Sequence, residues 1–195
     1  MGSDRCSRCG VHQKICVCDQ CSPITGTPPV WVVQDKQEAG HSKGTARLVE
    51  ACLVNARRVR ACHPSDLAAL EQCAADVSMG LMFPTPESQP LESADVTAIS
   101  EWILLDGTWR KAKRLFLSHP WLQALPQFHF AHPPPSQYRI RKAPGQGQLA
   151  TSEAVAHLLR HVAPECNVTP LDRALDALVS RQLAQIPPEL RHRYE

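Results

Sequence analysis

The residues best suited to chemistry follow an apolar segment near the middle of the chain. Residues 102–105 are apolar, and an acid, a glycine, a hydroxyl and a large aromatic come directly after them: Asp106, Gly107, Thr108 and Trp109. Apolar residues then recur at helical spacing, at Ala112, Leu115 and Phe116. This order predicts a strand, a loop and a helix. Open α/β sheets bind ligands at the carboxyl ends of their strands, so the loop is a candidate ligand site.

Two residues of this loop also have a structural explanation. An Asp just before a helix usually caps its first turn, and taken alone this role explains Asp106 better than a ligand contact does. Trp109 is equally well explained as a core tryptophan. Other parts of the chain are therefore needed to choose between a structural and a functional interpretation.

Three other segments carry groups that bind anions. Residues 145–154 combine two glycines with the hydroxyls of Thr151 and Ser152 at a predicted helix start, where backbone N–H groups hold carboxylates or phosphates. Residues 138–142 join a tyrosine to three cations, and such groups clamp phosphates and stack on bases. Residues 42–48 form another hydroxyl-bearing loop that leads into a helix. Together these segments favour a functional site.

Five of the nine cysteines crowd near the N-terminus: Cys6, Cys9, Cys16, Cys18 and Cys21. The first four form two close pairs separated by a short loop, a spacing typical of a tetrahedral zinc site. We predict these four as ligands of a structural zinc ion, with Cys21 as a spare or a substitute. An iron–sulfur cluster is the main alternative, and unmetallated thiols are the other. The remaining cysteines are scattered in apolar or helical context, as small buried residues usually are.

Composition and charge limit the class of protein. With 195 residues, 43% of them hydrophobic, the chain can bury one sizeable core and carry a small appendage. No apolar run approaches the roughly 20 residues that cross a bilayer, and the N-terminus does not resemble a signal peptide. We therefore expect a cytoplasmic protein without membrane association. Residues 106–145 carry seven Lys or Arg and one Asp, which suggests a nucleic-acid partner or, alternatively, a solvated basic face.

The pattern of elements predicts the fold class. Strands are expected at residues 30–34, 57–62, 79–83, 101–105 and 127–131. Helices are expected at residues 45–55, from residue 64, at 109–118, at 152–162 with a Thr151 or Ser152 cap, and over 171–183. Residues 84–95 and 132–150 are expected to be loops, and residues 187–195 a frayed end. Alternating strands and helices predict an α/β domain at 30–195, with a mainly parallel sheet and helices on both faces, after a cysteine module and linker at 1–29.

Taken together and in order, these motifs resemble the DTW-domain family. The resemblance covers the cysteine pairs, residues Thr45 to Leu48, the Asp106 to Trp109 core, the Tyr-Arg-Ile-Arg segment and residues 151–154. The bacterial members it resembles are tRNA-uridine aminocarboxypropyltransferases, which move the 3-amino-3-carboxypropyl group of S-adenosylmethionine onto N3 of a uridine in tRNA. The family is related to SPOUT enzymes, so the resemblance also implies a C-terminal trefoil knot. One departure is Gly44-Thr45-Ala46, where the family commonly has Asn-Thr-Gly.

The resemblance implies a role for each group of residues. Asp106 is the expected general base, and Thr108 and Trp109 are the other catalytic candidates. The residues expected to bind S-adenosylmethionine are Leu105, Gly107, Leu149, Ala150, Thr151, Ser152 and Glu153. Those expected to bind tRNA are Lys43, Arg47, Arg110, Arg139, Arg141 and Lys142. The protein is expected to act as a monomer or a homodimer.

Two other functions remain open on the sequence. The first is an rRNA aminocarboxypropyltransferase or a SPOUT-type RNA methyltransferase, which would use the same cosubstrate. The second is a zinc-containing RNA-binding protein without catalysis. Both enzyme hypotheses require the turns around Asp106 and Ser152 to converge in one pocket.

Overall fold

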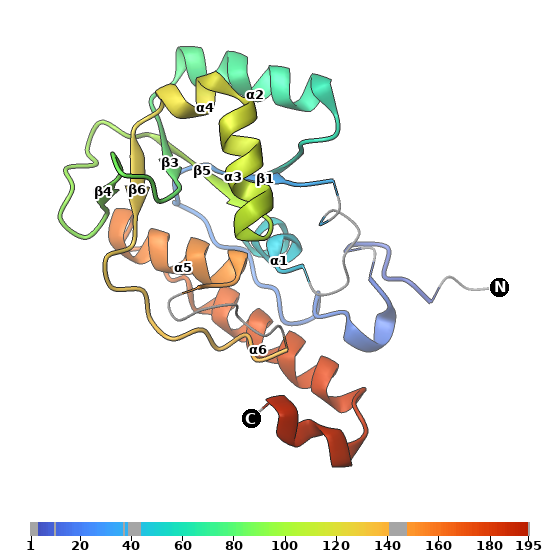
Figure 1. The fold of residues 1–195 in the computed structure, drawn as a ribbon. Helices are drawn as coiled ribbons and strands as arrows, with labels where there is room; N and C mark the ends of the chain where they lie inside the picture. The colour runs from blue at the N-terminus through green and yellow to red at the C-terminus, as the bar shows by residue number, and fades with distance from the viewer. Residues whose placement is uncertain (1–3, 10, 37, 39–43, 141–147, 195) are drawn as a thin grey trace.

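The computed structural model describes residues 4–9, 11–36, 38, 44–140 and 148–194, and within these the strands form one six-stranded sheet (Figure 1). The strand order is β2-β1-β5-β3-β6-β4, and each described pairing is parallel. The strands are β1 (Val30–Gln34), β2 (Ala56–Arg60), β3 (Met79–Met82), β4 (Gln89–Pro90), β5 (Glu101–Asp106) and β6 (Gln127–His129). The prediction of a parallel α/β sheet is therefore confirmed.

Helices cover both faces of the sheet (Figure 1). On one face lie α1 (Ala46–Cys52), α5 (Thr151–Val162) and α6 (Thr169–Ala184), and on the other lie α2 (Pro64–Asp76), α3 (Trp109–Ser118) and α4 (Pro120–Ala124). Side chains of a strand point alternately to its two faces, so Trp102 and Leu104 of β5 join the first core while Ile103 joins the second. A central parallel strand is buried on both faces, which explains its uninterrupted apolar run.

The structure departs from the sequence predictions at short elements. Strand β4 lies inside the predicted loop 84–95, and helix α4 was not predicted, because two to five residues are too few to show a hydrophobic repeat. Residues Pro188–Tyr194 form a 3-10 helix where a frayed end was expected. Helix α5 begins at Thr151 with Ala150 as its N-cap residue, so neither Thr151 nor Ser152 caps it.

The N-terminal segment packs on the first face of the sheet. Arg181 of α6 pairs with Asp19 at 2.6 Å, and the Nη2 of Arg8 donates a 3.0 Å hydrogen bond to the carbonyl of Ala51. Val17 is buried in the same core as α1 and α6. A 3-10 turn at Gln13–Ile15 completes the segment. None of the described helices combines the length and apolar character that a membrane span requires.

Candidate active site and cysteine cluster

A pocket of about 570 Å³ lies at the carboxyl ends of the central strands. Strands β1 and β5 end side by side, with Gln34 opposite Asp106 in the ladder. The turn after β5 and the segment before α5 both contribute to its wall. Most of the lining is apolar, and its polar members include Thr45, Asp106, Thr108, His129, Ser136, Tyr138, Gln148 and Thr151. A largely apolar cavity with a few convergent polar groups is the usual form of a small-molecule site.

Asp106 is held by hydrogen bonds from two different elements. Its Oδ2 accepts a 2.8 Å hydrogen bond from Nε2 of Gln34, and its Oδ1 accepts a short one from Oγ1 of Thr151. The residue is only 8% exposed. Each carboxylate oxygen therefore accepts one of these hydrogen bonds, which fixes the orientation of the side chain. Asp106 therefore presents a buried, fixed acceptor at the pocket wall.

The contact between Asp106 and Thr151 brings the two predicted turns into one site. Leu149, Ala150 and Thr151 line the same pocket as Leu105, Asp106 and Gly107. The backbone N–H of Ser152 donates a 3.2 Å hydrogen bond to Oγ1 of Thr45, which ties α5 to the start of α1. The predicted convergence of the Asp106 and Ser152 turns is confirmed.

Glu153 supports this part of the pocket wall through hydrogen bonds, although it does not line the cavity itself. Its carboxylate accepts hydrogen bonds from the N–H of Ala150 at 2.7 Å, the hydroxyl of Ser136 at 2.7 Å and the N–H of Gln137 at 2.6 Å. It thereby joins the first turn of α5 to the 132–140 segment. Ser152 is buried, and neither Ser152 nor Glu153 belongs to the lining among the residues described, so both shape the pocket rather than face it.

Trp109 lines the pocket and is partly exposed to solvent. It is 51% exposed, and its ring stacks on Phe83 with centroids 5.1 Å apart and an interplanar angle of 16°. The alternative of a core tryptophan is wrong. The N-cap residue of α3 is Thr108, which also lines the pocket, so Asp106 does not serve as the helix cap.

Some of the basic residues near the pocket form ion pairs with acidic side chains. Arg110 and Arg139 are exposed, as an RNA contact requires. In contrast, Lys111 pairs with Glu38 and Arg114 with Asp35, each at 2.9 Å. These ion pairs partly neutralise the positive charge that the sequence shows over residues 106–145.

Arg47 does not fit its predicted contact with tRNA phosphates. It is only 7% exposed, and burial lowers its pKa, an effect that the nearby thiols and Tyr138 oppose. Four consecutive residues of α1, Ala46 to Val49, are buried, which one helix face cannot explain, and Arg47 lies beside Arg8 and Cys9 of the N-terminal segment. The predicted RNA contacts Lys43, Arg141 and Lys142, together with Gly145 to Gly147, lie outside the described residues.

Sequence reasoning missed Gln34 and His129 as site residues. Gln34 is a polar residue at the end of a β-branched run, which is the sequence signal that indicates it, and in the structure it is 2% exposed. His129 lines the pocket, and its Nδ1 lies 2.9 Å from the hydroxyl of Ser88. That hydroxyl donates to the carbonyl of Thr85, so it accepts from Nδ1 and leaves Nε2 of His129 available.

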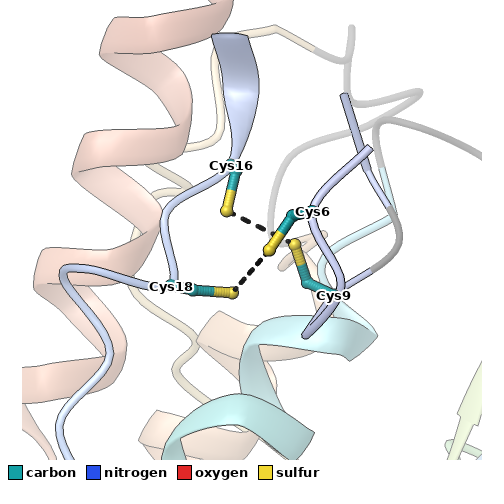
Figure 2. Close-up of side chains that lie close together, drawn as sticks. All are labelled: Cys6, Cys9, Cys16 and Cys18. Carbon is teal, nitrogen blue, oxygen red and sulfur yellow. Dashed lines mark hydrogen bonds between the residues drawn. The ribbon is translucent and has the colours of Figure 1, made fainter. Parts of the chain in front are cut away.

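Four cysteines form a compact cluster in the N-terminal segment (Figure 2). The Sγ atoms of Cys6, Cys9, Cys16 and Cys18 all lie within 4.8 Å of one another. Cys6 and Cys18 are 3.8 Å apart, and Cys9 and Cys16 are 3.6 Å apart. Four sulfurs at about 2.3 Å from a tetrahedral zinc ion are about 3.8 Å from each other. The cluster therefore has the dimensions of a four-thiolate metal site.

Cys21 takes a different position. It is buried in the core, where its thiol lies 3.3 Å from the carbonyl of Val17, and it does not belong to the group of four. Within the cluster, hydrogen bonds led by the backbone N–H of Cys9 lower the pKa of Cys6 to about 6. Burial raises the pKa of Cys16 and of Cys18. A cation would offset that cost, because metal binding favours the thiolate form.

Comparison with known proteins identifies the family. The DTW domain model matches residues 3–183. The tRNA-uridine aminocarboxypropyltransferase 2 of Drosophila melanogaster is 29% identical over 194 residues, covering 92% of this chain and 75% of the fly protein. The protein of the same name from Mus musculus is 29% identical over 189 residues, covering 91% of this chain but only 63% of its own length. No solved structure matches the chain significantly. Because the domain model spans nearly the whole sequence, the chain belongs to the DTW domain family.

Proposed function

We propose that this protein transfers the 3-amino-3-carboxypropyl group of S-adenosylmethionine to N3 of a uridine in tRNA. The observation that carries the proposal is the position of Asp106, a buried carboxylate fixed by Gln34 and Thr151 in the wall of a pocket. The names of the fly and mouse relatives support the reaction class.

The reaction needs a base and precise positioning. Uridine N3 carries a proton at neutral pH, and Asp106 accepts that proton as the N3 lone pair attacks the methylene beside the sulfonium. A carbon–nitrogen bond forms, the carbon–sulfur bond breaks, and its electron pair stays on sulfur, so that 5′-methylthioadenosine leaves. The proton on Asp106 then passes to water. General-base assistance contributes about 10²–10⁴-fold, and positioning supplies the rest.

Different pocket residues would bind S-adenosylmethionine and support the pocket wall. Backbone groups of Leu105, Gly107 and residues 149–151 hold the cosubstrate, since their side chains are apolar, absent or already engaged. Ser152 and Glu153 support this wall from behind. The same cosubstrate carries a transferable methyl group, so the orientation set by these walls decides which carbon faces uridine N3.

Exposed groups at the pocket would receive the tRNA. Trp109 offers a stacking surface for a base, with Thr108 beside it. Arg110 and Arg139 contact phosphates. We extend this role to Lys43, Arg141 and Lys142, as the family resemblance implies.

Mass spectrometry of RNA incubated with the protein and S-adenosylmethionine tests the proposal. A gain equal to one aminocarboxypropyl group on tRNA supports it. A methyl gain would instead indicate an RNA methyltransferase, and a gain on rRNA alone would indicate a different substrate. RNA that is bound but unmodified would indicate a binding protein without catalysis.

We propose a structural zinc ion for the cysteine cluster. The separation of the four Sγ atoms supports this assignment, and four thiolates leave no open position for a substrate. When bound, the ion would stabilise a polar segment too small to bury a core of its own. Metal analysis that finds iron and inorganic sulfide would favour the cluster alternative.

Finer features of the fold and assembly also remain proposals. We propose that the C-terminal region forms the trefoil knot of SPOUT enzymes, supported by the position of residues 149–152 against the carboxyl end of β5 and the start of α1. A crystal structure that traces residues 141–147 without threading would contradict it.

We further propose that the protein is cytoplasmic and acts as a monomer or a homodimer. Cell fractionation would test the location, and light scattering would measure the oligomeric state.

A further inference from the structure

A second group of metal-ligating side chains lies beside the pocket, away from the cysteine cluster. His157 and His161 are one turn apart on α5, and Glu92 follows strand β4. One ligand atom from each of the three lies within 4.8 Å of the others. The two imidazole rings meet edge to face, with centroids 4.7 Å apart. Nothing in the proposed transfer reaction uses these residues.

His157 has a buried ring nitrogen that forms no hydrogen bond with the described residues. Its Nε2 is inaccessible to solvent and has no hydrogen-bond partner among the described residues, and it lies 4.0 Å from Oε1 of Glu92. A neutral imidazole keeps a lone pair on one ring nitrogen, which is the form that binds metals. A buried polar atom without a partner costs free energy, so a ligand there would be favourable.

The other two groups are oriented as ligands usually are. Nδ1 of His161 lies 2.9 Å from the carbonyl of His157 and must donate to it, which leaves Nε2 of His161 as an acceptor. Glu92 accepts hydrogen bonds from the N–H groups of Ala131 and His132 at 3.0 and 3.2 Å. Burial opposes ionisation of Glu92, but these hydrogen bonds outweigh it and lower its pKa. Supporting hydrogen bonds of this kind are typical around metal ligands.

We propose that Glu92, His157 and His161 form a second metal site, which binds Zn²⁺ or a similar divalent transition-metal ion with water in the remaining position. Two imidazoles and one carboxylate suit such ions, and a tetrahedral site separates its ligand atoms by about 3.4 Å. Small side-chain rotations would close the present spacing. This proposal does not depend on the proposed transferase activity.

The bound ion would strengthen one wall of the pocket. Phe130 lines the pocket and packs edge-on against His157, with centroids 4.6 Å apart, and Ala154 lines it one turn before His157 on α5. Glu92 holds the backbone of the residues that follow Phe130. The ion would therefore join α5 to the β4–β5 connection, and through the hydrogen bonds of Glu92 to the residues after Phe130.

Cobalt titration of the untagged full-length protein separates this site from the cysteine cluster. Thiolate ligands give Co²⁺ an intense charge-transfer band, whereas a two-histidine, one-carboxylate site gives only weaker d–d bands. We expect two equivalents of Co²⁺ or Zn²⁺ per chain, one with the thiolate band and one without. Zn²⁺ at the second site should also raise the melting temperature of a protein whose cysteine cluster is already filled.

Two variants and a control make the result specific. His161→Ala changes an exposed residue, and Glu92→Gln keeps the shape of the carboxylate. Each should lower affinity for the second equivalent at least about tenfold and leave the thiolate band unchanged. His63→Ala is the matched control, because His63 also lies near a carboxylate, Asp66 at 3.6 Å, but outside this cluster. A wild type that binds Co²⁺ only with the thiolate band, or a band-free equivalent unaffected by both variants, would overturn the proposal.

Discussion

The side-chain amide of Gln34 donates a 2.8 Å hydrogen bond to Oδ2 of Asp106, across the ends of two adjacent parallel strands. Both residues are buried, so the amide fixes one carboxylate oxygen while Thr151 fixes the other. The candidate base is therefore held by the sheet on one side and by α5 on the other.

Replacing Gln34 should impair transfer without abolishing cosubstrate binding. Gln34→Leu removes the hydrogen bond from Gln34 Nε2 to Oδ2 of Asp106, a loss of about 1–3 kcal/mol, and weakens the restraint on the carboxylate. We expect a roughly tenfold to hundredfold lower single-turnover rate with little change in the dissociation constant of S-adenosylmethionine. Gln72→Leu, an exposed position on α2, is the control. Equal rates in the two variants would show that this hydrogen bond does not position the base.

Asp106→Asn tests the base itself. The change keeps the side-chain shape, and the Gln34 amide can turn to present Oε1 to the new NH₂ group. We expect the transfer rate to fall by about 10²–10⁴-fold, as for loss of a general base, while calorimetry still detects S-adenosylmethionine binding. The exposed Asp95→Asn should retain full activity. Full activity of Asp106→Asn would remove this residue from the mechanism.

Trp109→Ala should weaken RNA binding more than it weakens the fold. The stack on Phe83 accounts for about 0.5–1.5 kcal/mol of stability, whereas loss of base stacking costs about 1–3 kcal/mol of RNA affinity. Filter binding with tRNA and thermal unfolding measure the two effects. Leu117→Ala, another exposed apolar side chain on α3, should change neither. A variant that loses stability but binds tRNA normally would assign Trp109 a structural role.

Arg110 and Arg139 should contribute to the salt dependence of tRNA binding. Each phosphate contact contributes about 0.7–0.9 to the slope of log affinity against log salt concentration. Arg110→Ala and Arg139→Ala should each reduce the slope by about that amount, in titrations at several salt concentrations. Arg173→Ala, an exposed change on α6, serves as the comparison and should leave the slope intact. Unaltered slopes in the first two variants would place tRNA elsewhere.

Substitution of single cysteines should distinguish the metal ligands from the cysteines that do not bind metal. Cys9→Ser should weaken the thiolate charge-transfer band of the cobalt-substituted protein and lower the affinity of the cysteine site for Co²⁺, because it removes one of four ligands. Cys21→Ser and the exposed Cys62→Ser should retain the band. Chelation should lower the melting temperature of the wild type, since the ion would join residues 6–9 to residues 16–18, which are too few to bury a core of their own. Loss of the band in Cys21→Ser would reassign the ligand set.

The sequence by itself determined the parts of this protein that depend on local patterns. β-Branched and apolar runs predicted the central strands β1, β3 and β5, because a strand buried on both faces must be apolar throughout. The spacing of Cys6, Cys9, Cys16 and Cys18 predicted the cluster, since short loops keep such pairs close. The order of motifs also identified the family, which the domain model confirmed.

Only the tertiary structure decided which distant residues meet. Gln34 and Asp106 are 72 positions apart, and Thr151 is a further 45 from Asp106, so no local pattern predicts their contact. Packing likewise buried Arg47, exposed Trp109 and placed Cys21 in the core. Strand order and helix packing set these neighbours, and they follow from the burial of apolar surface across the whole domain rather than from any short segment.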